Sequence, residues 1–466
     1  MAQPRWFRTP VALTTLPFAI AAVSAHAQRS PDSPARDSAV SITLGPSIVP
    51  LDGPWRFHTG DDPHWADPAF DDSSWETMDL TPQPGAHDPD VGLTGYVQGW
   101  GARGHPRYSG YAWYRMRVSV RGGRGAALAL AGPLDVDQAY QLFVNGRLLG
   151  GSGRFDGATP AVFNTRPAMF ALTDVAGAAP LLPNGDLLVA VRVWAGPEYM
   201  REVPDGGGIR IAPALGETAA IGAHYTLDWL AKFLGYVVEV VEAIAFALLA
   251  VMALGVERFE PSNRSYRWLA GALVLIAIAR ANQAVFYWTT WESAHTAILL
   301  RFVYVDPLAL GAWAMAWRGW FRLERPTWLP ACIAGLTALY VVTDFIAAAN
   351  LGSVSHAALA MTTPIRVLFV AVMAIIIYGS LSRPAPRDWL AIAAMLLVSI
   401  GLYAQEVSAL RVPGIWFPFG VGVSRTQYAY AAFAVVTFVL MMRRLAAFAR
   451  AGRAAGVSIP LHAAFD

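Results

Sequence analysis

The stretch WLAKFLGYVVEVVEAIAFALLAVMAL, residues 229–254, decides the fold class of this chain. It is almost entirely apolar and slightly longer than the ~20 residues that a helix needs to cross a bilayer. It also holds Lys232, Glu239 and Glu242, and charges inside a membrane span are costly enough to mark a functional hypothesis. The sequence therefore predicts a membrane-spanning helix with charged residues inside it.

Six further apolar stretches follow, so we predict seven spans at residues 229–254, 266–288, 296–317, 328–349, 356–379, 388–408 and 424–448. The 466 residues are 55% hydrophobic and 15% charged, with a mean hydropathy of +0.39. Soluble domains carry roughly 25% charged residues, so an ordinary soluble enzyme is excluded. A net charge of +2 is too small for a general nucleic-acid binder. Cys332 is the single cysteine, so an internal disulfide or a cysteine-based zinc site is excluded.

Arginine placement predicts the orientation of these spans. If residues 28–224 lie outside the membrane, the inner loops and tail hold most of the arginines that follow: Arg258, Arg264, Arg267, Arg318, Arg322, Arg325, Arg383, Arg387, Arg443, Arg444, Arg450 and Arg453. The outer loops hold Arg411. This bias follows the positive-inside rule and predicts a multi-pass protein of the bacterial inner membrane, with a periplasmic N-terminal domain and a cytoplasmic C-terminus.

Residues 1–27 are typical of a secretory signal peptide: Arg5 and Arg8 precede an apolar stretch, which ends at Ala25-His26-Ala27. The alternative is a retained signal anchor. Residues 28–224 have the composition of a soluble domain, with short alternating segments at 111–120, 126–131, 140–144 and 187–194. That pattern predicts an all-β jelly-roll sandwich. Residues 225–448 would form an all-α seven-helix transmembrane bundle, and 449–466 a short cytoplasmic tail.

Several motifs in the N-terminal domain have clear scaffold roles. Asn145-Gly146 suits a type I′ hairpin turn. Trp55, Trp75 and Trp113 are expected in the core, and Asp71 and Asp72 are expected to cap a turn.

The same motifs carry a resemblance. The segments 51–57, 60–63, 66–75, 112–115, 144–150 and 188–194 resemble the galactose-binding-like jelly roll that serves as the sugar-binding domain of family 2 glycoside hydrolases. The resemblance implies a carbohydrate-like ligand. The catalytic barrel of those enzymes is absent from this sequence.

Loop residues are the candidate ligand contacts in this domain. The glycine-rich segment 96–111 and a second group supply aromatic faces and polar donors, which sugar sites use: Trp100, Arg103, Arg107, Tyr108, Tyr111, Arg154, Glu198 and Tyr199. The alternative is that segment 96–111 is an insertion packed on the sandwich or on the membrane.

The remaining candidates are charged residues inside the predicted spans, at Glu239, Glu242, Arg280, Arg301, Asp306, Asp344, Arg366 and Glu406. Each lies in the outer half of its span or near the midplane, and the inner halves are almost purely apolar. This distribution predicts an outward-facing polar pocket or ion-pair network; static pairing that fixes helix register is the alternative. Either disfavours a proton pump, whose polar groups continue toward the inner face.

An outer β-domain followed by seven spans also resembles the bacterial seven-transmembrane receptors with diverse intracellular signalling modules. In that family a phosphatase, kinase or cyclase module follows the spans, and none is present in this sequence. The resemblance implies a receptor that couples a carbohydrate or periplasmic protein to a separate cytoplasmic signalling partner, in contact with membrane lipid. We find no catalytic motif, and we expect no enzyme activity, cofactor, metal or nucleic-acid partner.

Three alternatives remain open. The first is a membrane-embedded enzyme that uses outer-half carboxylates on a lipid-linked substrate. The second is a scaffold whose β-domain binds an outer protein. The third is the truncated sensor half of a longer phosphatase, kinase or cyclase receptor.

Overall fold

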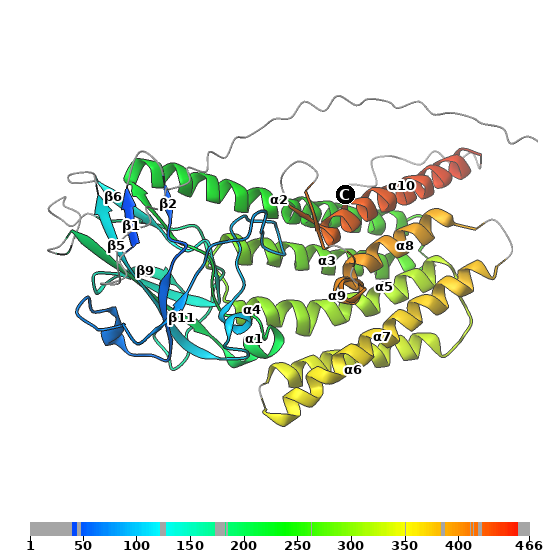
Figure 1. The fold of residues 1–466 in the computed structure, drawn as a ribbon. Helices are drawn as coiled ribbons and strands as arrows, with labels where there is room; N and C mark the ends of the chain where they lie inside the picture. Colours follow the sequence, from blue (N-terminus) through cyan, green and yellow to red (C-terminus); the bar gives the residue numbers. More distant parts are fainter. Residues whose placement is uncertain are drawn as a thin grey trace, which may run out of the picture. The chain divides into compact units, whose positions relative to one another are not determined.

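A computed structural model describes residues 40–454 apart from 44–47, 122–126, 173–181, 183–184, 262, 350, 384–386, 411, 413 and 418–421. The predicted signal peptide, residues 1–27, lies outside the described residues, as do residues 455–466 of the predicted tail. The N-terminal part of the described chain is rich in β-strands, and the rest is helical (Figure 1).

The β-rich part has two main sheets. The larger one runs in the order β4 (Glu76–Met78), β3 (Trp55–Thr59), β5 (Gly110–Arg121), β11 (Asp186–Ala195), β8 (Ala139–Val144) and β9 (Arg147–Ser152), with β1 (Val40–Thr43) parallel to one end of β5. The smaller runs β10 (Met169–Ala171), β6 (Leu128–Ala131), β13 (Ala214–Glu217) and β2 (Val49–Pro50). A separate pair joins β12 (Gly208–Ile211) to β7 (Asp135–Asp137). We call this part, residues 40–217, the sandwich.

One apolar core joins the two main sheets. Alternate residues of the central strands, such as Val189 and Val191 on β11, pack with Leu130 on β6 and Leu215 on β13. Period-two alternation places these side chains on one face of each strand. The predicted core tryptophans are confirmed, since Trp55, Trp75 and Trp113 are all buried. The four segments predicted as strands are likewise found in β5, β6, β8 and β11.

The predicted turns are also found. Asn145 and Gly146 both have positive φ, as a type I′ turn between β8 and β9 requires. Asp71 accepts a hydrogen bond from the backbone N–H of Ser73. Asp72 does more than cap a turn, because its carboxylate lies 2.7 Å from Nε of the fully buried Arg115. That guanidinium also donates to backbone carbonyls of segment 65–70 and holds it on the sheet.

The helical part contains six helical spans that are long and apolar enough to cross a membrane. They are α2 (Thr218–Glu257), α3 (Ser265–Trp288), the continuous Ala294–Trp320, α6 (Leu329–Ala348), α7 (Ser353–Leu381) and α10 (Arg425–Ala454), the last counted to Ala451. The third of these consists of α4 (Ala294–Ile298), a π-helical turn at Leu299–Val305 and α5 (Asp306–Trp320). Six such helices among the described residues suggest a membrane protein.

The prediction of a seventh span at 388–408 needs correction. That segment is divided into α8 (Trp389–Leu402) and α9 (Ala404–Ala409), because the backbone of Tyr403 leaves the helical conformation. A break frees carbonyl groups, which inside a membrane protein need protein partners. Arg366 donates to the carbonyl of Leu402 at 2.8 Å, and Arg425 donates to that of Ala404 at 2.9 Å. Two arginines therefore compensate for a break that hydropathy does not reveal.

Many large apolar side chains are exposed on the surface of the helices. On α2 the exposed residues Val241, Ile244, Leu248 and Val251 form one stripe at helical spacing, while Phe246 and Leu249 on the other face are buried. Exposed apolar patches of this extent mark contact with another apolar phase. Lipid tails would supply that phase.

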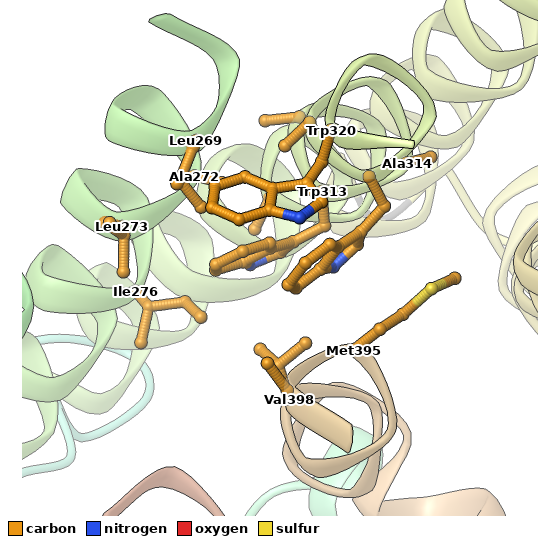
Figure 2. Close-up of a cluster of buried hydrophobic side chains, with 14 of the residues drawn as sticks. Leu269, Ala272, Leu273, Ile276, Trp313, Ala314, Trp320, Met395 and Val398 are labelled. Atoms are coloured by element: carbon orange, nitrogen blue, oxygen red, sulfur yellow. The ribbon is translucent and has the colours of Figure 1, made fainter. Parts of the chain in front are cut away.

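A cluster of aromatic side chains fills the end of the helical part that is distant from the sandwich. Trp313 and Trp317 of α5 stack with ring centroids 5.9 Å apart, and Trp313 also meets Phe433 of α10 at 5.2 Å. Figure 2 shows Trp313 and Trp320 between Leu273 and Ile276 of α3 and Met395 and Val398 of α8. Segments 308–317 and 433–442, which the sequence predicts to be apolar inner halves, contribute Trp313, Trp317 and Phe433 to this core, and their position on the inner side stays a prediction.

The predicted boundary between the two parts, at residue 224, lies within α2. Strand β13 ends at Glu217 and α2 begins at the next residue, Thr218, so no linker separates sandwich from helix. At 40 residues α2 is about 60 Å long, twice the ~30 Å hydrocarbon thickness of a bilayer. The first turns of α2 therefore belong with the sandwich, where they pack along β6, β10 and β13.

Candidate functional site

The sandwich and the helices meet at a loop, residues 87–94, that lies against α2. Asp88 shapes this loop by accepting hydrogen bonds from the backbone N–H groups of Asp90, Val91 and Leu93. Val91 then fits between two glycines: a Cβ atom at Gly235 of α2 would lie 2.7 Å from the Cβ of Val91, and one at Gly422 would lie 2.3 Å from its carbonyl oxygen. The sequence can place the loop this close because neither position carries a side chain.

Polar contacts fix the same junction. Tyr236 of α2 donates a hydrogen bond to Asp90 at 2.6 Å, and its ring stacks on Tyr287 of α3 with centroids 3.7 Å apart. Lys232, one turn earlier, donates to the side-chain oxygen of Asn164 at 2.5 Å and to the carbonyl of Thr165. We call the loop 87–94, residues 164–165 and the α2 segment 232–236 the junction.

The electrostatic environment of the junction is dominated by Asp135 on β7. Burial, together with the nearby charge of Asp137, raises the pKa of Asp135 to about 7, and the positive charge of Lys232 opposes that rise. Asp137 is itself held 3.5 Å from Arg210. Asp135 therefore changes its charge near neutral pH at the point where the sandwich meets α2.

The raised pKa of Asp135 predicts a pH-dependent stability. An ordinary aspartate in the unfolded chain has a pKa of 3.8, so folding favours the protonated form, and stability falls as pH rises from about 4 through about 7. We expect Asp135→Asn to remove this fall in stability with pH. The melting temperature of the variant, relative to that of the wild type, should therefore rise between pH 5 and pH 8. Thermal unfolding in detergent at stepped pH measures the difference, with the exposed Asp205→Asn as control. Parallel curves for the wild type and Asp135→Asn would contradict the assignment.

A stripe of residues runs through the junction along one face of α2, formed by Asp228, Lys232, Gly235, Glu239 and Glu242 at alternating steps of four and three residues. Gln427 of α10 donates to the carbonyl of Gly235 at 3.1 Å and to Glu239 at 3.2 Å. The stripe links the junction directly to the predicted intramembrane charges.

Arg280 of α3 holds two of those charges. Its Nη1 lies 2.6 Å from Oε2 of Glu239 and 3.8 Å from Oε2 of Glu242, and all three side chains are at least 95% buried. The guanidinium also lies over the ring of Tyr430 on α10, 5.2 Å from its centroid. Charges this deeply buried depend on one another for compensation.

A second ion-pair group surrounds Arg366 of α7. It binds Glu406 of α9 through two hydrogen bonds of 2.5 and 2.9 Å, and it donates to the hydroxyl of Tyr340 on α6 at 3.2 Å. Asp344, also on α6, accepts from Thr362 of α7 at 3.0 Å. Asp306 is the first residue of α5 and follows the π-helical turn that carries Arg301, whose guanidinium lies 5.2 Å from the centroid of the Phe302 ring. The structure thus pairs five of the eight predicted residues, Arg280 with Glu239 and Glu242 and Arg366 with Glu406, a finding that the static-pairing interpretation also fits.

The predicted ligand residues of the sandwich lie in several places. Trp100 is fully buried and donates to the carbonyl of Tyr108 at 3.2 Å. Tyr108 in turn donates to the carbonyl of Tyr111 at 2.6 Å, and Arg103 donates to the carbonyls of Gln98 and Asp79. Segment 96–111 therefore packs extensively on the sandwich. Arg107 is exposed, Arg154 lies apart over the ring of Phe163, and Glu198 and Tyr199 lie on α1 (Pro197–Glu202). Their ligand role stays a prediction.

Tyr111 belongs to a half-buried platform whose other members, Arg192, Phe155 and Gln141, were not among the predicted ligand contacts. The guanidinium of Arg192 lies 4.0 Å from the centroid of the Tyr111 ring and 5.6 Å from that of Phe155. Arg192 also binds Asp61 at 2.5 and 2.7 Å and Gln141 at 2.7 Å. Both Arg192 and Gln141 occupy polar positions on otherwise apolar strands. That alternation is a signal from which an outward-facing polar platform could have been predicted.

Comparison with known proteins gives limited likeness. No protein-family model matches the chain, and no curated protein matches it. Among solved structures, a Bacteroides uniformis β-glucuronidase matches at 18% identity and a TM-score of 0.26, over 36% of this chain and 17% of that enzyme. A β-glycosidase from Bacteroides vulgatus matches at 19% identity and a TM-score of 0.24, over 36% of this chain and 20% of that one. Bifidobacterium dentium β-glucuronidase, solved with coumarin-3-O-glucuronide, matches at 19% identity and a TM-score of 0.22, over 31% of this chain and 19% of that enzyme. The chain thus spans a fifth or less of the length of these enzymes.

Proposed function

We propose that this protein is a membrane receptor, in which the sandwich takes up a ligand outside the membrane and α2 passes the resulting motion to the helices. The observation that carries the proposal is the direct continuation of β13 into α2, together with the junction contacts of Lys232 and Tyr236. A helix without a flexible linker moves with the domain from which it emerges. Any reorientation of the sandwich would therefore act on the stripe of α2.

The remaining parts of the account follow from the arginine distribution. The sandwich would lie in the periplasm of a bacterial inner membrane, and a separate cytoplasmic signalling protein would read the inner ends of the helices. For the sandwich we favour a carbohydrate-like ligand on the platform of Tyr111, Arg192 and Phe155, because sugar sites combine aromatic faces with a few polar groups. A periplasmic protein on the same face is the second candidate.

The receptor proposal can be tested with the natural cysteine. Cys332 lies near the start of α6, at the end of the helices distant from the sandwich, and it is partly exposed. The full chain is placed in lipid nanodiscs, Cys332 is labelled with an environment-sensitive fluorophore, and soluble mono- and oligosaccharides, including a β-glucuronide, are titrated. We expect a saturable fluorescence change that Lys232→Met diminishes without weakening sugar binding. Sugar binding that never alters the fluorescence would contradict signal transfer through α2.

The membrane-embedded enzyme is less well supported by the geometry. Glu239 and Glu242 do lie near one another, as an acid–base pair would, but their side chains are 2% and 4% exposed and share Arg280. Glu406 is held by Arg366. Carboxylates that are buried and paired in this way are poorly placed to reach a lipid-linked substrate.

A further inference from the structure

A cavity of about 240 Å³ lies between the sandwich and the first turns of α2. At roughly 30 Å³ per water molecule it has room for about eight waters, or for one small organic molecule. The loop 91–94, which Gly422 contacts, and residues 131, 132, 134, 211 and 212 of the sandwich form three of its sides. The fourth is the face of α2 that carries His224, Asp228 and Ala231, at steps of four and three residues.

The cavity combines one carboxylate with aliphatic walls. Asp228 has 15% of its side chain exposed, and its Oδ2 lies 3.5 Å from Nε2 of His224. Among the described residues, His224 is the one charged or titratable group that acts on this carboxylate. Val91, Leu134 and Ile211 supply apolar surface. No Phe, Tyr or Trp is among the described residues that line the cavity, which sets it apart from the platform of Tyr111 and Phe155 that we propose for a sugar.

The carboxylate of Asp228 and the aliphatic walls together favour one class of ligand. A carboxylate in a partly desolvated site gains most from a cationic donor, because charge-assisted hydrogen bonds are about twice as strong as neutral ones. Aliphatic walls favour a ligand whose remaining part is hydrocarbon, and a single carboxylate matches a single positive charge. An inorganic cation would need several oxygen ligands, and no group of three acidic or histidine side chains suited to a metal occurs among the described residues.

We propose that this cavity binds a small monovalent organic amine, whose ammonium group pairs with Asp228 and whose hydrocarbon part lies against Val91, Leu134 and Ile211. The site deepens the proposed receptor function, on which its role in signalling rests. Asp228 is the first member of the stripe that continues through Lys232 to Glu239. An amine held there contacts both the sandwich and α2, so it would favour the arrangement in which the two are joined.

The test uses the full chain in nanodiscs and a matched pair of probes, 4-aminobutan-1-ol and 1,4-butanediol, which differ in one amino group. Calorimetric titration should show that the amine binds about tenfold more tightly than the diol, or better. Asp228→Asn should abolish this preference. Asp205→Asn, which removes an exposed carboxylate elsewhere on the sandwich, should leave it unchanged.

A second variant tests the cavity without changing its charge. Ala231→Leu adds volume at the α2 wall and keeps a strong helix former, so the helix should fold as before and the amine should bind at least about tenfold more weakly. Failure of the wild type to prefer the amine, or an unchanged preference in Asp228→Asn, would overturn the proposal. The label on Cys332 separates the amine site from the receptor function. If the amine binds and the fluorescence does not change, the receptor proposal is contradicted and the amine site is supported. If a sugar changes the fluorescence and the amine does not bind, the amine site is contradicted and the receptor proposal is supported.

Discussion

Replacing Arg280 with methionine is expected to lower the free energy of unfolding by about 3–5 kcal/mol, because it leaves two buried carboxylates without their common counter-charge. Arg280 Nη1 lies 2.6 Å from Glu239 and 3.8 Å from Glu242, and all three side chains are nearly inaccessible. Methionine fills a similar volume, so the loss would come from charge rather than from a cavity. Equilibrium unfolding of the detergent-solubilised protein by added SDS measures the change.

The chain offers a matched control on the same helix. Arg267 of α3 pairs with Glu257, but its side chain is 65% exposed, and an exposed pair is worth about 0–1 kcal/mol. Arg267→Met should therefore have little effect. Adding Glu239→Gln and Glu242→Gln to Arg280→Met should restore most of the lost stability. The account of this group is wrong if Arg280→Met costs no more than Arg267→Met, or if the two glutamines bring no recovery.

The second large effect is expected at the junction, from Lys232→Met. Lys232 donates to Asn164 and Thr165 of the sandwich, and a hydrogen bond from a charged donor contributes about 1.5–3 kcal/mol. The variant should separate the sandwich from α2 at a cost of about 3 kcal/mol, while each part keeps its own core. Spin labels on Arg147→Cys of the sandwich and on Cys332 should then show a broader distance distribution than in the unmutated junction. Arg258→Met, which removes an exposed cation at the other end of α2, is the control and should leave the distribution unchanged.

Much of the fold could be predicted from the sequence because local sequence patterns determine its helices, strands and turns. Period-two alternation marked the central strands, Asn145-Gly146 marked the hairpin, and long apolar runs marked the six helical spans. Hydropathy could not show the break at Tyr403, because Leu402 and Ala404 are apolar and the compensating Arg366 and Arg425 come from other helices. Compensation across helices is a tertiary property.

The candidate site was predicted only in part, for a related reason. The sequence identified Lys232 as an intramembrane charge, whereas the length of α2 places it against the sandwich. The aromatic residues of segment 96–111 were identified by composition, which cannot distinguish the buried Trp100 from the half-buried Tyr111 of the platform. Gly235 and Val91 carry no chemical signal in the sequence, although their close contact fixes the junction.

One distance measurement shows whether the sandwich and the helices move together through α2. The full chain carrying Arg147→Cys and the natural Cys332 is spin-labelled in lipid nanodiscs, and the distances between the two labels are recorded by pulsed electron paramagnetic resonance. The account predicts one narrow distribution, because β13 continues into α2 without a linker and Lys232, Tyr236 and Val91 fix the joint. A broad distribution, or several separate distances, would show that the sandwich turns freely on the membrane and would contradict the account.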